Sequence, residues 1–370
     1  FFNVFGEEQP STGSYAPAVA RFINQVENKT PITVTGDGLQ TRDYIYVKDI
    51  VSALVLTINN PEYKYEIFNV GSGIEYVILD IATQKGIDPD SASVGEVGAC
   101  GLSLSSVADL QEAFKGVVFS AVPIYWQTGM AGIPVLALFA AYLNKAKVST
   151  KDVRGSFDMD PLGSYLKAGE LPVSVERSFD ELAAATLWTE RNTPAMATLG
   201  VQGNVYSEAG ANAVQELAYT LSATTEYLRA LDSRNVSPKT LLSRTRWLFA
   251  VGPHFFTEVS KFRAARILWA NLLRAYGLDV TQIPARLHAR TGLYHKTVYD
   301  PHNNLLRSSM EAFSAIVGGI ESLHVGPFDE VAREPDSFSR RLARNTQVIL
   351  REECNLDKII DPAGGSYYVE

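Results

Sequence analysis

Arginines gather in the second half of the chain, in and around the short apolar runs that would form buried strands. They are Arg244, Arg246, Arg286, Arg290 and Arg307. A guanidinium fork matches the paired oxygens of carboxylates and phosphates, so arginines that meet at one opening would bind an acyl-CoA or another anionic substrate. Ion pairs with the excess of acidic residues are the alternative, and the sequence does not decide between the two.

A second candidate group is the carboxylate of Glu330, in the segment Pro327-Phe-Asp-Glu330. This segment directly follows the apolar run 322–325, which we expect to be the last strand. Enzymes built on a barrel of parallel strands place functional groups at the carboxyl ends of those strands. We therefore expect a functional carboxylate here.

Two groups of residues have the spacing of a cofactor-binding or catalytic motif, but the secondary structure expected around them does not fit that motif. Gly95, Gly98 and Gly101 have the spacing of a dinucleotide-binding loop, but a polar turn precedes them where a buried strand is required. Tyr44 and Lys48 have the YxxxK spacing of a catalytic proton-transfer pair, but they lie in an alternating, strand-like run and not on a helix. Structural roles are favoured for both.

The histidines and cysteines do not predict a metal site. The histidines are His254, His288, His295, His302 and His324, and they form neither an HExxH motif nor a clustered ligand set. A DxHxxG corrin-ligand motif beginning at Asp300 would need glycine where Leu305 stands. Cys100 and Cys354 have no zinc-type or disulfide-type spacing, which favours a reduced, cytoplasmic setting.

Composition describes an ordinary globular chain. Hydrophobic residues make up 46% and charged residues 20% of the 370 residues, and the formal net charge is −8. A net negative charge without a basic stripe argues against a nucleic-acid partner. The longest apolar run, 133–142, contains a proline and is far shorter than the roughly 20 residues that cross a bilayer, so we expect a buried helix and no membrane partner.

Beyond residue 77 the pattern alternates between short apolar runs and long amphipathic stretches. Strands are expected at 77–80, 121–125, 196–200, 247–250, 286–290 and 322–325, and helices at 106–114, 211–231, 256–276 and 305–317. Such alternation predicts parallel α/β structure, and the length suits a (β/α)₈ TIM-type barrel. A doubly wound sheet is the alternative on pattern alone.

The first 74 residues have a different character, with β-branched runs at 32–35, 44–47 and 67–70 and helical stretches at 16–27 and 47–58. A piece of this size buries only about 60% of its unfolded surface and would be marginal alone. We therefore predict two parts, 1–74 and 77–370. An artificial junction is the alternative to a natural fusion. Because the chain opens on Phe1 and not on Met, we expect the natural N-terminus to lie upstream.

The first part resembles the C-terminal, substrate-side portion of NAD-dependent sugar-nucleotide epimerases and dehydratases, which are extended short-chain dehydrogenases. The resemblance rests on Phe2-Asn-Val-Phe-Gly6, on residues 15–23 and 32–49, and on Phe68-Asn-Val-Gly-Ser-Gly73. It implies that Asn3 and Arg42 contact nucleotide-sugar phosphates. The family's NAD-binding loop and its catalytic Tyr/Lys pair would lie upstream of Phe1, so a binding or scaffold role is the expectation for this part.

The second part resembles the barrel domain of the adenosylcobalamin-dependent methylmalonyl-CoA mutase family. The matches include Asp160-Pro-Leu-Gly163, Glu208-Ala-Gly-Ala211, Pro327-Phe-Asp-Glu330 and Asp361-Pro-Ala-Gly-Gly-Ser-Tyr367, together with residues 262–270 and 341–347. The resemblance implies radical rearrangement of the carbon skeleton of an acyl-CoA, with the cofactor supplying the radical and the barrel shielding it.

Several positions depart from the catalytic pattern of that family. The histidine that binds the thioester carbonyl corresponds to Val205, the catalytic glutamine to Asp158, and a substrate-side serine to Arg246. Two positions agree with the family. Arg244 corresponds to an arginine that binds the substrate, and Glu330 corresponds to a carboxylate that contacts the adenosyl ribose.

These departures resemble the family's non-catalytic small subunit. The resemblance therefore implies a chain that is inactive alone and forms a heterodimer with a catalytic mutase subunit. The first barrel strand, expected before residue 77, and the cobalamin-binding domain, expected after Glu370, are not recognisable in the sequence. We thus predict an incomplete (β/α)₈ barrel preceded by a small α/β piece.

Overall fold

The computed structural model describes residues 4–5, 45–46, 75–93, 97–98 and 101–370. The chain divides into two compact units, Phe1–Gly71 and Ser72–Glu370. In the first unit, strands β1 (Val4–Phe5) and β2 (Ile45–Tyr46) pair in parallel. The extended conformation predicted for the run at 44–47 is thus confirmed at Ile45 and Tyr46. The flanking Tyr44 and Lys48 lie outside the described residues.

Parallel strands form the sheet of the second unit and follow one another in chain order across it. They are β3 (Glu75–Ile78), β4 (Ile124–Gln127), β5 (Gly155–Met159), β6 (Met196–Gln202), β7 (Thr245–Val251), β8 (Leu287–Thr291) and β9 (Ser322–His324). Sequential order with every pair parallel gives an incomplete TIM-type barrel, as predicted, and excludes the doubly wound alternative. Within the described residues, β3 and β9 each pair with one neighbouring strand.

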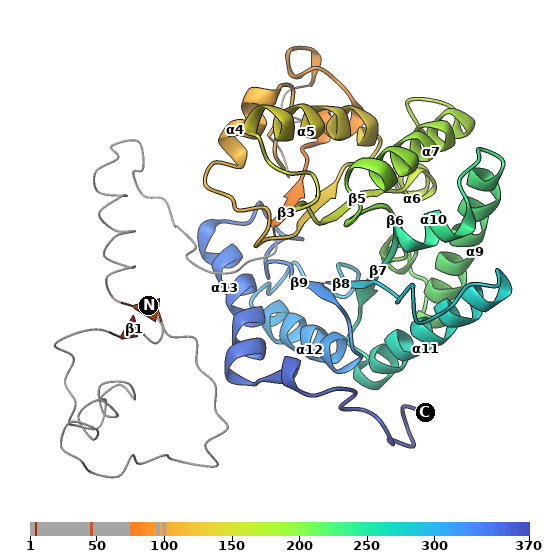
Figure 1. Ribbon diagram of the computed structural model, residues 1–370. Coiled ribbons are helices and arrows are strands. Elements are labelled where there is room, and N and C mark those ends of the chain that lie inside the picture. The colour runs from red at the N-terminus through yellow and green to blue at the C-terminus, as the bar shows by residue number, and fades with distance from the viewer. Residues whose placement is uncertain (1–3, 6–44, 47–74, 94–96, 99–100) are drawn as a thin grey trace, which may run out of the picture. The chain divides into compact units, whose positions relative to one another are not determined.

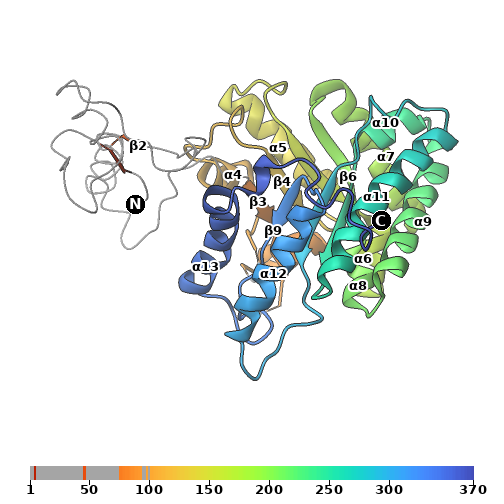
Figure 2. The ribbon, with the colours of Figure 1, turned by 90° about the horizontal axis from the view of Figure 1, so that it is seen from below.

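Helices follow the strands and lie on the outside of the curled sheet (Figures 1 and 2). They are α3 (Ile81–Lys85), α4 (Val107–Ala113), α5 (Gly132–Ala146), α6 (Pro161–Ala168), α7 (Val175–Asn192), α8 (Asn204–Glu208), α9 (Ala213–Asp232), α10 (Pro238–Ser243), α11 (Phe255–Ala275), α12 (Asn303–Val317) and α13 (Ser337–Val348). Short turns of helix are η1 (Pro89–Ser91), η2 (Ile349–Glu353) and η3 (Leu356–Lys358). The predicted helices at 106–114, 211–231, 256–276 and 305–317 correspond to α4, α9, α11 and α12.

Short polar side chains begin the helices where the chain leaves a strand. Asp80 after β3 accepts a hydrogen bond from the Thr83 amide at 2.8 Å. Asp160 after β5 accepts one from the Gly163 amide at 3.1 Å, and a proline occupies the first turn of α6. These side chains satisfy amides that have no partner within the helix. The sequence therefore fixes where the chain turns at the carboxyl ends of the strands.

Aromatic side chains pack between the sheet and α5. Trp126 on β4 lies 5.1 Å from Phe139 and 6.1 Å from Phe157, measured between ring centroids, and all three side chains are buried. Burial of each ring contributes roughly 1.5–3 kcal/mol to folding. The apolar run 133–142 lies in α5, which confirms the predicted buried helix. No helix in the described ranges has the length and apolarity needed to cross a membrane.

A buried lysine joins two helices to the end of a strand. Nζ of Lys261, on α11, lies 2.8 Å from Glu216 on α9 and 2.5 Å from Glu258, and it donates to the carbonyl of Ala250 at 2.6 Å. The amide of Ala250 in turn donates to Glu216 at 2.9 Å. Burial lowers the pKa of Lys261, but the two carboxylates outweigh it and hold that pKa above its usual value. The lysine is therefore a charged cross-link at the end of β7.

We expect the substitution Lys261→Met to lower the free energy of unfolding by about 3–5 kcal/mol, because it leaves two buried carboxylates without their cation. Urea denaturation measures this loss. Lys115→Met is the matched control, since Lys115 is 54% exposed and pairs with Glu112 at 3.6 Å. An exposed pair of that kind contributes less than about 1 kcal/mol. Equal losses in the two variants would contradict the role of Lys261.

Candidate functional site

An ion pair lies inside the barrel, where Asp158 of β5 meets Arg246 of β7. Nε of Arg246 lies 3.0 Å from Oδ1 of Asp158, and the two side chains are 4% and 5% exposed. Strand β6 lies between β5 and β7, so the pair spans the interior face of that strand. The positions that the resemblance aligns with a glutamine and a serine thus hold opposite charges in contact.

The backbone of β5 and β6 makes room for this pair. Asp158 has a φ of 40°, a left-handed conformation that is uncommon outside glycine. The pairing of β5 with β6 shifts register between Ser156 and Met159, on either side of Asp158. A Cβ atom at Gly200 on β6 would lie 2.5 Å from Oδ1 of Asp158. The aspartate therefore occupies space that a glycine at position 200 leaves open.

The surroundings of the pair act on its two charges in opposite ways. Burial raises the pKa of Asp158, and the neighbouring Arg246 opposes that rise. The guanidinium of Arg246 also lies over the ring of Tyr125 on β4, 4.3 Å from its centroid, where it gains a cation–π contact. Because arginine stays protonated in proteins, loss of Asp158 would take away the carboxylate that lies 3.0 Å from its buried charge.

Val205 stands at the position that the family resemblance aligns with a thioester-binding histidine. It lies in α8, directly after β6, and is 8% exposed. The adjacent Tyr206 packs against Tyr219 of α9, with ring centroids 5.2 Å apart. A valine side chain has no hydrogen-bond donor, so this position offers nothing to a carbonyl oxygen.

Acidic residues flank an arginine at the carboxyl ends of the strands. Arg290, on β8, lies 3.0 Å from Glu330 and 3.7 Å from Glu208. Burial raises the pKa of Glu330, and Arg290 opposes the rise. Oε1 of Glu330 is buried and has no hydrogen-bond partner among the described residues. That oxygen can accept a hydrogen bond from a ligand hydroxyl, which is the kind of contact that the family resemblance implies for Glu330.

The structure places Arg244 at the opposite end of the barrel, just before β7. Its Nη1 donates to the carbonyl of Met196 at 2.8 Å, so the side chain ties the start of β7 to the start of β6. The side chain is largely buried, and burial lowers its pKa. A role for Arg244 in substrate binding stays a prediction. Asn3 and Arg42, the predicted phosphate contacts of the first unit, lie outside the described residues.

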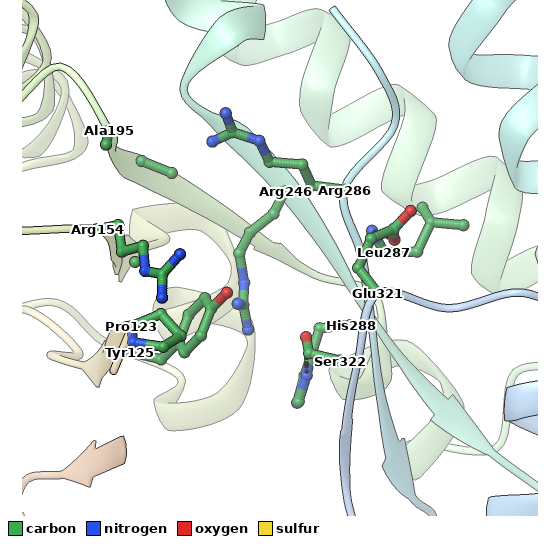
Figure 3. Close-up of a pocket in the computed structure, with 12 residues that line it drawn as sticks. Pro123, Tyr125, Arg154, Ala195, Arg246, Arg286, Leu287, His288, Glu321 and Ser322 are labelled. Carbon is green, nitrogen blue, oxygen red and sulfur yellow. Dashed lines mark hydrogen bonds between the residues drawn. The ribbon is translucent and has the colours of Figure 1, made fainter. Parts of the chain in front are cut away.

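The arginines singled out in the sequence do not share one opening. Arg246 and Arg286 line a cavity of about 370 Å³ at the amino ends of the strands, together with Arg154 and Tyr125 (Figure 3). Arg290 lies at the carboxyl ends, and Arg307 donates to Asn304 on α12. Sequence reasoning missed Arg154 and Tyr125, because each stands alone at the start of a short strand and no motif marks it.

Gly98 in the glycine spacing and His288 among the histidines form hydrogen bonds to other side chains. The amide of Gly98 donates to Asp80 at 2.7 Å, while Gly95 lies outside the described residues. Nδ1 of His288 lies 3.0 Å from the hydroxyl of Ser322, and burial lowers the pKa of His288 well below its usual value. No group of three or more histidine, cysteine or acidic side chains within the described ranges could hold a metal ion.

A double-mutant cycle tests the interior ion pair. We expect Asp158→Gln to cost about 3–5 kcal/mol in free energy of unfolding, because the buried guanidinium of Arg246 loses the carboxylate of Asp158. Arg246→Ser should cost less, since a lone buried Asp158 can take up a proton. The double variant, which carries both residues of the catalytic pattern, should lose less than the sum of the single losses, by roughly 1–3 kcal/mol. Additive losses in chemical denaturation would show that the pair is not coupled.

Comparison with known proteins places both parts of the chain. Residues 56–370 match the family model for methylmalonyl-CoA mutase, and residues 1–71 match that of the NAD-dependent epimerase/dehydratase family. The two matches share residues 56–71. Both resemblances seen in the sequence are thus confirmed.

Curated relatives that match the second part of the chain are also named methylmalonyl-CoA mutase. A methylmalonyl-CoA mutase of Rhizobium meliloti is 35% identical over 296 residues, which are 80% of this chain and 42% of the relative. The Escherichia coli enzyme is 34% identical over the same length. A methylmalonyl-CoA mutase small subunit of Porphyromonas gingivalis is 39% identical over 239 residues, or 64% of this chain and 38% of the relative. The chain spans about two fifths of the length of these relatives, and it belongs to the methylmalonyl-CoA mutase family.

Proposed function

We propose that residues 77–370 act as the structural, small-subunit type of this family, inactive alone and paired with a catalytic mutase subunit. The observation that carries the proposal is the Asp158–Arg246 ion pair. In this buried pair, the two charges neutralise each other inside the barrel. The resemblance implies that a catalytic chain has a neutral glutamine and a neutral serine at these positions, facing an acyl-CoA. Val205 removes the donor for the thioester carbonyl as well.

The relatives support a two-subunit arrangement. Porphyromonas gingivalis has proteins named as the small and as the large subunit of methylmalonyl-CoA mutase, and both match this chain. Overall identity does not separate the types, since the large subunit is 33% identical and the small subunit 39%. The residues at positions 158, 205 and 246 are therefore our basis for assigning the chain to the small-subunit type.

The carboxyl ends of the strands keep one feature that suits the family's adenosylcobalamin. The adenosyl ribose presents hydroxyl donors, and Glu330 presents a buried oxygen with no partner among the described residues. Glu330 would hold the ribose, while Arg290 would keep its carboxylate charged. The cofactor supplies the carbon-centred radical in the family. In this chain, Glu330 would bind the adenosyl ribose without any reaction following.

The decisive experiment co-expresses this chain with a catalytic mutase subunit and follows co-elution by size exclusion and turnover of methylmalonyl-CoA with adenosylcobalamin. We expect a stable, active heterodimer, and no turnover by this chain alone. A matched heterodimer carries a catalytic subunit whose thioester-binding histidine is replaced by alanine, and it should be inactive. Turnover by the isolated chain, or by the heterodimer with the disabled partner, would refute the proposal.

A second candidate function rests on the epimerase/dehydratase match at residues 1–71. We propose that this part, predicted to span residues 1–74, binds a nucleotide sugar through Asn3 and Arg42 without NAD-dependent chemistry. Isothermal titration with UDP-glucose measures it, and Arg42→Ala should weaken binding at least about tenfold, because a charged hydrogen bond is lost. Arg229→Ala, at an exposed position of α9, is the control. Failure to detect saturable binding would end this candidate.

A further inference from the structure

A groove of about 340 Å³ lies between helices α6, α8 and α9, in the helical layer outside the barrel interior. Helix α8 contacts both of the other two, and the three helices lie together in Figure 2. The volume falls within the range of roughly 300–1,000 Å³ that is usual for binding pockets. Tyr165 of α6, Tyr206 of α8 and Tyr219 of α9 line the groove. Three aromatic rings from separate helices thus meet at one hollow.

The apolar side chains of this groove are only partly covered. Tyr165 is 50% exposed, Leu166 beside it is 50% exposed, and Tyr219 is 45% exposed. Tyr206 packs against Tyr219, with ring centroids 5.2 Å apart and ring planes at 49°. Burial raises the pKa of Tyr206, and the Asp160 carboxylate adds to the rise, so the Tyr206 hydroxyl stays neutral. Exposed apolar side chains that adjoin one another mark a place where another molecule binds.

The groove has one charged side chain, and that side chain is acidic. Among the described residues that line it, Glu226 alone is charged. Lys167 and Glu170, which follow Leu166 in the chain, are exposed and do not line the groove. Glu226 is 50% exposed and pairs at 3.7 Å with Arg229, which is 74% exposed. A pair this exposed is weak, so Glu226 is open to a cation that is held more firmly.

Aromatic rings beside a carboxylate suit a guanidinium group. The face of a tyrosine ring attracts cations, and a planar guanidinium stacks on such a face while its N–H groups reach a carboxylate. Because the rings are half exposed, a free cation would be covered on one side only. An arginine on a protein surface would be covered on the other side by the surface that carries it. Tyrosine and arginine are also enriched among the residues that dominate the affinity of protein interfaces.

We propose that this groove binds an arginine side chain of the catalytic mutase subunit. The guanidinium lies against the rings of Tyr165 and Tyr219, and its N–H groups donate to the carboxylate of Glu226. This inference rests on the proposed subunit role and adds the surface at which the two chains meet. The Asp158–Arg246 pair and the Glu330 carboxylate take no part in it, since neither lines the groove.

The dissociation constant of the heterodimer, measured by sedimentation on the full chain and a catalytic subunit, tests the proposal. We expect Tyr219→Ala and Glu226→Gln each to raise it at least about tenfold, because each removes a contact to the guanidinium. Tyr219→Phe keeps the ring and should bind like the unaltered chain. Tyr276→Ala is the matched control, since Tyr276 is 38% exposed at the end of α11 and does not line the groove.

A pair of competitors tests the charge of the occupant. Excess Nα-acetylarginine amide should weaken the heterodimer, whereas Nα-acetylcitrulline amide, which has nearly the same shape and no charge, should leave it unchanged. Equal competition by the two compounds would overturn the proposal, because the groove would then not select a cation. Circular dichroism checks that each variant folds. Glu226→Gln alters one exposed side chain and should leave the fold intact.

The outcomes separate this groove from the subunit role. A heterodimer that forms equally well with Tyr219→Ala, Glu226→Gln and Tyr276→Ala would refute the groove and leave the subunit role standing. Absence of any heterodimer with the unaltered chain would refute both. Self-association of the isolated chain that is lost in Tyr219→Ala would assign the groove to a second copy of this chain, which also overturns the proposal.

Discussion

The ion pair between Asp158 and Arg246 is the constraint around which the barrel interior is organised. Burial disfavours both charges, because an unpaired ion buried in protein costs several kcal/mol. Asp158 depends on Gly200 for space, and Arg246 lies over the ring of Tyr125. An interior arranged in this way holds opposite charges at the two positions that the family resemblance aligns with a glutamine and a serine.

The pair also separates the two ends of the barrel electrostatically. At the carboxyl ends, Arg290 is shared between Glu330 and Glu208, so acidic groups outnumber the cation. At the amino ends, Arg154 and Arg286 form no ion pair with any described residue, and the carboxylate of Glu321 lies at the same opening. The two ends therefore present different sets of charged side chains. This polarity follows from which residues stand at the first and last positions of each strand, since parallel strands align all their amino ends on one side.

Much of the fold could be predicted because long periodic helices and apolar strands leave a clear pattern. Helices α9, α11 and α12, and strands β6, β7 and β8, were predictable to within a few residues. Strand β5 was missed, since Gly155-Ser-Phe-Asp-Met159 places polar residues toward the barrel interior and does not alternate. Helix α7 was missed as well, although its buried side chains, among them Phe179 and Leu182, follow helical spacing. Polar residues that face a barrel interior cannot be told from loop residues without their partners.

The sequence by itself determined the family and the parallel α/β architecture, and it placed a valine at position 205, an aspartate at 158 and an arginine at 246, where the family resemblance expects other residues. These follow from local pattern and ordered motifs, which need no knowledge of distance. Only the tertiary structure decided that Asp158 and Arg246 neutralise each other, that Arg244 is tied to the backbone of β6, and that Arg154 joins Arg286 at one opening. Contacts between strands that are tens of residues apart in the chain depend on strand order and register, and no local pattern encodes which side chains those will bring together.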